Sequence, residues 1–183
     1  MEFSSTPLSG LYVINPQVFA DERGYFYESF NQEAFDKAGI SAEFVQDNQS
    51  LSQKGTLRGL HAQAPPFAQG KLVRVIQGEV LDVVVDIRKE SPTYGEHFTI
   101  HLSGENKTML WIPPGFLHGF ITLANDTIFS YKVSGALYNK ASEIGICWND
   151  SSLAINWQVD QSDILLSEKD KMLPAFATFN SPF

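Results

Sequence analysis

The sequence predicts an all-β protein, folded as an antiparallel barrel or jelly roll with a few short helices. Three observations predict this class. Short runs rich in Val, Ile, Phe and Tyr recur along the chain, turn residues separate them at regular intervals, and only one early segment has the pattern of a helix. No linker, repeat or shift in composition divides the chain, so we expect one domain spanning residues 1–183.

The first predicted elements are a strand and a helix. "GLYVINP" (residues 10–16) is typical of a strand because it is rich in β-branched and aromatic residues. "NQEAFDKAGI" (residues 31–40) predicts the helix, because Asn31 is a suitable N-cap and Gly39 a suitable terminator.

The middle of the chain predicts paired strands. "KLVRVIQGEVLDVVVDIR" (residues 71–88) indicates a hairpin with its turn at Gln77–Gly78. Its second arm alternates, which predicts two opposite faces: Leu81, Val83, Val85 and Ile87 on one, and Asp82, Val84 and Asp86 on the other. Four further strands follow, "HFTIHLS" (97–103), "TMLWIPP" (108–114), "GFITLA" (119–124) and "TIFSYKV" (127–133), and the tail predicts a helical turn before Pro174.

Composition and charge restrict the classes of function. The net charge of −8 argues against wholesale binding to nucleic acid or to anionic membranes, so local positive charge must meet any anionic ligand. The one cysteine, Cys147, excludes an internal disulfide and a cysteine-based zinc site. No apolar run is long enough to span a membrane, and the start lacks the pattern of a signal peptide, so we expect a cytoplasmic protein.

The segment "LRGLHAQAPPFAQGKLVR" (residues 57–74) gathers three cations and a histidine in an acidic chain. Polar side chains inside a barrel are costly without partners, so an interior His, Lys or Tyr is a candidate for a functional site. Strict alternation puts Arg58 and His61 on opposite faces of a strand. Both line one site only if Gly59 permits a bulge, or if Arg58 serves the neighbouring subunit.

Two of the four histidines are candidates for a site. His97 and His101 share a face of one strand, where we expect surface or edge positions. His61 and His118 each follow a glycine turn, "RGLH" and "PPGFLHGF", and could begin a metal site on neighbouring strands. Gln63 stands where a second histidine would be needed, and no carboxylate has the right spacing. The pattern explains His61 equally well as a core histidine or as a functional one.

Two other candidates also have a structural explanation. In "SEKD", Ser167 and Asp170 fit the N-cap and N3 positions of a capping box. Tyr131 shares a strand face with Phe129 and Val133, which favours core packing on spacing alone.

Nine blocks carry a resemblance that covers nearly the whole chain. In order they are "DERGYFYESF", "FVQDNQS", "LRGLHAQ", "AQGKLVRVIQGEVLDVVVDIR", "SPTYGEHF", "LSGENKTMLWIPPGFLHGF", "YKV", "WND" and "LSEKD". Together they resemble the dTDP-4-dehydrorhamnose 3,5-epimerase family, which are metal-independent cupin enzymes of nucleotide-sugar metabolism. The ordered set is specific for the family and less so for one substrate.

The resemblance implies a cupin jelly-roll homodimer that acts on a dTDP-linked 4-keto-6-deoxy sugar without a cofactor or metal. It implies that His61 is the base, paired with Asp170, and that Tyr131 is the proton donor on the other side of the sugar. Lys71 is a suitable partner for the enolate oxygen. The implied substrate contacts are Arg23, Glu28, Gln46, Asn48, Arg58, His118, Glu143 and Lys169, with Tyr138 stacking on the thymine.

Two departures from the family pattern concern the nucleotide end. Ala62 replaces the usual Tyr or Phe after the histidine of "GLH", and we expect it to enlarge the pocket. The segment 132–137 is one residue longer than usual and lacks the first of a pair of tyrosines.

The sequence therefore favours epimerisation at C3 and C5 of dTDP-4-dehydro-6-deoxyglucose, giving dTDP-4-dehydro-L-rhamnose for dTDP-L-rhamnose biosynthesis. The C4 ketone acidifies both carbons, so the reaction needs a base, an acid across the ring and positive charge near the C4 oxygen. The alternatives are a single-carbon epimerase of a related sugar, a metal-dependent cupin oxygenase using His61 and His118, and a non-catalytic sugar-binding barrel.

Overall fold

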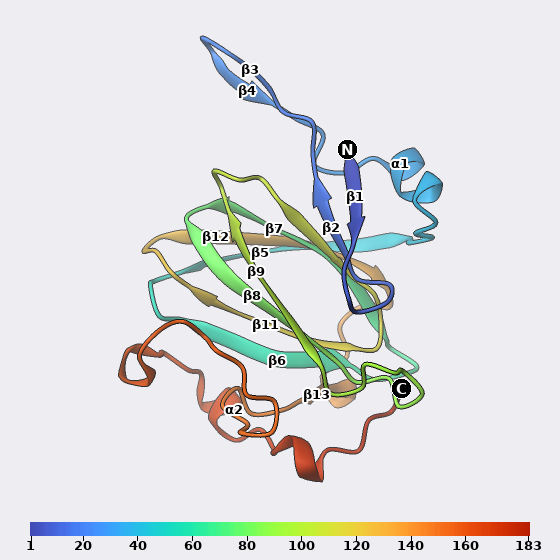
Figure 1. The fold of residues 1–183 in the computed structure, drawn as a ribbon, viewed down its shortest axis with the longest axis vertical. Coiled ribbons are helices and arrows are strands. Elements are labelled where there is room, and N and C mark those ends of the chain that lie inside the picture. Colours follow the sequence, from blue (N-terminus) through green and yellow to red (C-terminus); the bar gives the residue numbers. More distant parts are fainter.

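Two antiparallel sheets face each other in the computed structural model, which describes residues 1–183, and they form the predicted cupin-like jelly roll (Figure 1). The larger sheet contains, in spatial order, β1 (Glu2–Ser5), β2 (Tyr12–Asn15), β10 (Met109–Ile112), β7 (Gln69–Gln77), β12 (Thr127–Gly135) and β5 (Phe44–Ser52). The smaller sheet contains β13 (Glu143–Gly145), β6 (Leu57–Gln63), β11 (Phe116–Thr122), β8 (Glu79–Asp86) and β9 (His97–Ser103). The fold class predicted from the sequence is confirmed.

The predicted hairpin at Gln77–Gly78 is wrong. β7 pairs with β10 and β12 in the larger sheet, whereas β8 pairs with β11 and β9 in the smaller one. Gly78, with φ of +79°, carries the chain from one sheet to the other, and a Cβ there would lie 2.3 Å from Thr127 Oγ1. The glycine correctly marked a turn, but the partners of each strand are distant in sequence, so a local pattern could not identify them.

The alternation predicted for β8 is confirmed, and both of its faces are buried. Val80 and Val84 belong to the apolar cluster between the two sheets. Leu81 and Val83 face the other way and pack with Trp157 of the C-terminal segment, which lies along the outer side of the smaller sheet (Figure 1). The C-terminal segment therefore covers what would otherwise be an exposed sheet face.

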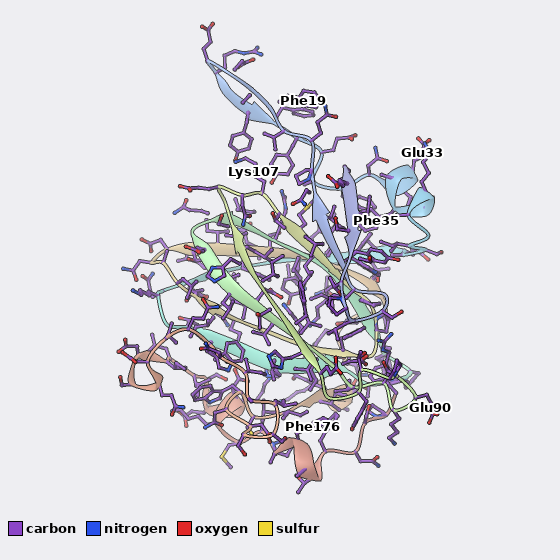
Figure 2. The ribbon with its side chains drawn as sticks, viewed as in Figure 1. Phe19, Glu33, Phe35, Glu90, Lys107 and Phe176 are labelled. Atoms are coloured by element: carbon purple, nitrogen blue, oxygen red, sulfur yellow. The ribbon has the colours of Figure 1, made fainter.

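The helices are short. In α1 (Gln32–Lys37), Asn31 accepts a hydrogen bond from the Ala34 amide, and Gly39 follows with φ of +77°, as predicted. Phe35 of α1 is fully buried and points toward the larger sheet, where it meets Trp111 edge to face (Figure 2). The second helix, α2 (Glu168–Lys171), and 3-10 turns at Lys140–Ser142, Gln161–Asp163 and Phe176–Thr178 lie later in the chain. No helix is both long and apolar enough to cross a bilayer.

A two-stranded arm of β3 (Phe19–Asp21) and β4 (Gly24–Phe26) projects from the barrel (Figure 1). Its paired aromatic residues are unusually open to solvent: Phe19 is 56% exposed and Phe26 is 67% exposed. Figure 2 shows Phe19 on this arm, away from the core. Large exposed apolar groups gathered on one element are typical of an interaction surface.

Asp86 anchors the end of β8. Its buried carboxylate accepts hydrogen bonds from Arg88 Nε at 2.9 Å, from Ser91 Oγ at 2.6 Å and from Thr93 Oγ1 at 2.7 Å. Burial raises the pKa of this carboxyl, but the hydrogen bonds outweigh that effect and lower it to about 2. The ionised group therefore holds the following turn against the barrel.

We expect Asp86→Asn to lower the free energy of unfolding by roughly 2 kcal/mol near neutral pH. The carboxylate stabilises the fold above its ordinary pKa of 3.8, and this contribution is lost as the pH falls toward about 2. Denaturant titrations of both proteins between pH 6 and pH 2 should show the difference shrinking as the pH falls. A constant difference across that range would contradict the assignment.

Candidate active site

Two adjoining cavities open between the sheets. The larger has a volume of about 380 Å³ and is lined by Asn48, Gln49, Ser50, Arg58, His61, Lys71, His118, Phe120, Phe129, Tyr131 and Lys169. The smaller has a volume of about 300 Å³ and is lined by Gln46, Asn48, His61, Ala62, Gln63, Gln69, Lys71, Tyr131, Tyr138 and Glu143. The cavities share four residues, Asn48, His61, Lys71 and Tyr131. These four therefore mark the junction of the two spaces.

His61 and Asp170 form a close pair. His61 lies on β6, and its Nε2 is 2.6 Å from Oδ1 of Asp170, which is almost fully buried on α2. Burial raises the pKa of Asp170, but the hydrogen bonds with His61 and Ser167 and the His61 charge bring it below its ordinary value. The carboxylate is thus ionised near neutral pH and fixes the orientation of the imidazole ring.

Asp170 takes part in the predicted cap and also contacts His61. Ser167 Oγ accepts a hydrogen bond from the Asp170 backbone amide at 3.1 Å, so it caps α2 as predicted. The Asp170 carboxylate meanwhile points to His61. Leu165 supports this arrangement, because its carbonyl accepts from the Leu57 amide at 3.0 Å and its own amide donates to the Gly55 carbonyl at 2.8 Å. The tail therefore docks at the start of β6, just before the helix that presents Asp170.

A bulge in β6 brings Arg58 and His61 to the same cavity. Opposite them on β11, Phe120 pairs with Arg58 and His118 pairs with His61, so β6 carries one extra residue across this interval. Gly59 has φ of +128°, and a Cβ there would lie 2.5 Å from Gly119 Cα. The predicted bulge is confirmed, and both side chains serve one cavity of the same chain.

Lys71 and Tyr131 lie on neighbouring strands β7 and β12, with Lys71 Nζ 6.0 Å from the centre of the Tyr131 ring. Burial lowers the pKa of the Lys71 ammonium to about 8, against the opposing charges of Asp82 and Glu143. Burial also raises the pKa of Tyr131 above its ordinary value of 10, against a hydrogen bond with Asn48. Near neutral pH the cavity therefore holds a charged lysine and a protonated tyrosine.

His118 pairs with a residue that the sequence analysis did not select for the site. Its Nε2 is 2.9 Å from Oδ2 of Asp82, a fully buried residue of β8. One signal was available in the sequence: Asp82 lies between Val80 and Val84 on the strand face that turns inward. His61 and His118 thus contact different carboxylates, and no group of three or more His, Cys, Asp or Glu is arranged to hold a metal. The geometry gives the metal-dependent alternative no ligand set.

Three predicted substrate contacts meet at the rim of the smaller cavity. Glu143 accepts a hydrogen bond from Lys169 Nζ at 2.5 Å and another from the Tyr138 hydroxyl at 3.0 Å. Two glutamines that the sequence analysis did not assign to the site hold the adjacent loop. Gln63 Oε1 accepts from the Asn139 amide at 2.9 Å, and Gln69 Nε2 donates to the Ala136 carbonyl at 2.7 Å.

The predicted contact Gln46 borders the same cavity, as does Ala62. Gln46 Nε2 donates to Asn48 Oδ1 at 2.9 Å. Ala62 lines this cavity and also belongs to the apolar cluster outside the smaller sheet. The expected enlargement of the pocket by Ala62 stays a prediction.

Arg23 and Glu28 lie away from both cavities. Arg23 is at the turn of the projecting arm, with its side chain 85% exposed and paired with Asp21. Glu28 accepts a hydrogen bond from Asn31 at the start of α1. Arg74 also lies outside, bonded to the Tyr27 hydroxyl at 3.0 Å, so only two of the three cations in the segment 57–74 line the cavities.

The remaining histidines have the expected edge positions. Both lie on β9, an edge strand of the smaller sheet. His101 is exposed and contacts Glu79 and Gln158.

A jelly roll that encloses a histidine–carboxylate pair, a charged lysine and a protonated tyrosine has the side chains that acid–base catalysis of proton transfer requires. A comparison with protein-family models places residues 5–178 in the family described as dTDP-4-dehydrorhamnose 3,5-epimerase. The chain belongs to this family and is therefore an isomerase, as the sequence resemblance predicts.

Relatives and solved structures agree with this assignment. The dTDP-4-dehydrorhamnose 3,5-epimerase of Shigella flexneri is 53% identical over 171 residues, which cover 93% of each chain. A crystal structure of dTDP-6-deoxy-D-glucose-3,5-epimerase from Legionella pneumophila, in complex with dTDP-4-keto-L-rhamnose, matches with a TM-score of 0.93 at 45% identity, covering 98% of this chain and 94% of that chain. A 3'-monoepimerase from Streptomyces bikiniensis, in complex with dTDP-quinovose, matches with a TM-score of 0.88 at 31% identity, covering 94% and 87%.

We expect epimerase activity to fall as the pH rises through about 8, because Lys71 loses its proton there while Tyr131 keeps its own. The activity of Lys71→Arg, although reduced by the change of shape, should persist to higher pH because a guanidinium stays charged. Initial rates from pH 6 to pH 10 measure both profiles. A wild-type profile that is flat to pH 10 would show that the charge on Lys71 is not needed.

Proposed function

We propose that this protein inverts C3 and C5 of dTDP-4-dehydro-6-deoxyglucose and so forms dTDP-4-dehydro-L-rhamnose. One observation carries the proposal: His61 with Asp170 behind it, Lys71 and Tyr131 meet at the junction of the two cavities. The Legionella relative was solved with dTDP-4-keto-L-rhamnose, which is the product expected from this reaction.

His61 is the proposed base. A neutral imidazole can remove a proton from the carbon next to the C4 ketone, because the resulting carbanion is stabilised as an enolate. The Asp170 carboxylate, 2.6 Å from Nε2, would stabilise the imidazolium that forms. Its burial strengthens this interaction, since little water competes for the carboxylate.

Lys71 and Tyr131 complete the proposed proton transfer. The Lys71 ammonium would stabilise the negative charge that develops on the C4 oxygen. Tyr131 then returns a proton to the face opposite His61, which inverts the carbon. Because its pKa is raised, Tyr131 holds this proton ready and brings no charge into the cavity beforehand.

The diphosphate and the base are the proposed ligands of the surrounding side chains. Arg58 and Lys169 line the larger cavity and carry charge that suits a diphosphate. Tyr138 is exposed at the rim of the smaller cavity, where its ring can stack on thymine. Lys169 must loosen its ion pair with Glu143 to turn fully toward a phosphate.

Inversion at one carbon is the second candidate. The Streptomyces bikiniensis relative is a 3'-monoepimerase, yet its fold matches with a TM-score of 0.88. Proton NMR of dTDP-4-keto-6-deoxyglucose with enzyme in D2O separates the candidates, because it reports which carbons exchange and which invert. Exchange and inversion at both C3 and C5 supports the proposal. Inversion at one carbon replaces it with the second candidate, and binding without exchange identifies a sugar-binding barrel.

We expect Tyr131→Phe to separate exchange from inversion. The ring and its packing against Phe129 remain, so the fold should persist. His61 can still remove a proton and return deuterium to the same face, whereas inversion should fall by ~100-fold or more. His61→Ala should instead lose both reactions. Both rates are measured in one NMR sample, and normal inversion in Tyr131→Phe would exclude this residue as the donor.

We further propose a homodimer in which the projecting arm packs against the partner protomer. The exposed Phe19 and Phe26 would then be buried, and Arg23 at the turn would lie against the partner rather than in solvent. We also propose a cytoplasmic location, since a chain with one cysteine has no internal disulfide that would require an oxidising compartment.

We expect light scattering at micromolar concentration to give the mass of a dimer. Phe26→Ser should shift the equilibrium toward monomer, because it removes apolar area from the arm. Met172→Ser is the matched control: Met172 is 84% exposed and follows α2, which lies at the other end of the molecule from the arm (Figure 1). A wild-type monomer, or equal dissociation in the two variants, would contradict the proposed interface.

A further inference from the structure

Asp82 is a buried carboxylate that is only half satisfied. Its neighbours on the inward face of β8 are Val80 and Val84, and it is 0% exposed. Oδ2 is 2.9 Å from His118 Nε2. Oδ1 is the one buried side-chain nitrogen or oxygen atom of the protein without a hydrogen-bond partner. Such an atom is costly, because desolvation of the carboxylate is only partly compensated. Burial raises the pKa of Asp82, and the cavity groups His118 and Lys71 oppose that rise and favour its ionised form.

Asp82 makes no structural contact in the fold that would offset this cost. Asp86, four residues further along the same strand and equally buried, binds Arg88, Ser91 and Thr93 and so anchors a turn. Asp82 anchors no turn or backbone amide, and a valine would match its two neighbours. The two groups that Asp82 affects, His118 and Lys71, both line the larger cavity.

The first dependent group is His118. Its ring is nearly fully buried and lies beside Phe129, at 6.1 Å between centroids and an interplanar angle of 26°. With Nε2 held by Asp82, Nδ1 is the ring nitrogen without a protein partner, and His118 lines the larger cavity. Asp82 therefore determines which nitrogen the ring can offer to a ligand.

The second dependent group is Lys71. It shares the cavities with Arg58, His61, His118, Tyr131, Lys169 and Glu143. Only Asp82 and Glu143 supply negative charge that favours its ammonium, and Asp82 contributes more. Asp82 and Lys71 form no ion pair, because the ion-pair partner of Asp82 is His118. The charge of Asp82 therefore favours the Lys71 ammonium from a distance, and the N–H donors of Lys71 stay free for a ligand.

We propose that Asp82 is a positioning residue of this site: it orients His118 and maintains the charge of Lys71 for the substrate's C4 oxygen. The effect on the substrate's C4 oxygen rests on the proposed function. The effects on the orientation of His118 and on the charge of Lys71 do not, because they are present in the protein without substrate. Asp82 itself touches no reacting atom.

Two variants of Asp82 test the proposal. Asp82→Asn preserves shape and removes charge. Asp82→Val matches the neighbouring valines and removes the unpaired Oδ1, but it leaves His118 Nε2 without its partner. The control is Asp86→Asn, which removes an equally buried carboxylate of the same strand outside the cavities. Melting temperature, kcat and KM are measured for all three.

We expect both Asp82 variants to lower kcat by about 10-fold or more with little change in KM. The reason is that Lys71 would stabilise negative charge that develops on the C4 oxygen only during the reaction. The melting temperature of Asp82→Asn should stay near that of the wild type, because the asparagine side-chain oxygen can still accept a hydrogen bond from His118. That of Asp82→Val should fall, because His118 loses its partner. Asp86→Asn should show the reverse of Asp82→Asn, with a lower melting temperature and a near-normal kcat. Near-normal kcat in the Asp82 variants would overturn the proposal.

Two NMR measurements on ligand-free protein make the test independent of activity. The side-chain nitrogen signals of His118 should change in both Asp82 variants, and the pKa of Lys71, followed through its 13Cε signal, should fall further below about 8. Neither should change in Asp86→Asn. Unchanged signals in the Asp82 variants overturn the positioning role even if the wild type is active. Changed signals in a protein that exchanges no substrate protons would instead refute the proposed function.

Discussion

The close approach of β6 and β11 at Gly59 and Gly119 is the constraint on which the site depends. Neither strand carries a side chain there, so the backbones meet where a Cβ on Gly59 would lie 2.5 Å from Gly119 Cα. The extra residue in β6 then turns Arg58 and His61 to the same side, while Leu57 and Leu60 remain together in the outer apolar cluster. A regular strand would send one of the two polar side chains into that apolar cluster, where its charge would have no partner.

The smaller sheet is the framework for this chemistry because it is buried on both faces. Its inner face meets the larger sheet across an apolar cluster, and its outer face is closed by the C-terminal segment. Burial disfavours charge inside the barrel, which lowers the pKa of Lys71. The low dielectric also strengthens the interactions between the charges that are present. Each of the two buried carboxylates contacts one cavity histidine: Asp170 contacts His61, and Asp82 contacts His118.

Local patterns in the sequence predicted local structure well. The cap at Asn31, the turn at Gly39 and the alternation of β8 depend on neighbouring residues, and all three are present. The hairpin at Gln77–Gly78 failed because strand pairing is decided by distant partners. Asp82 was placed on the correct face, but alternation says nothing about whether a buried carboxylate finds a partner. Arg23 followed from resemblance alone, and no pattern within one chain could show that it lies outside its own cavities.

The contact between Asp170 and His61 depends on the tail staying docked against the barrel. Asp170 reaches His61 from a helix of four residues, held by the Ser167 cap and by the pairing of Leu165 with the start of β6. So short a helix has little stability of its own, and it persists only while the segment stays docked. A local opening of the tail would separate the carboxylate from the imidazole without unfolding the barrel. Under the proposed mechanism, the fraction of time that the tail spends docked would limit the fraction of molecules in which His61 has its carboxylate partner.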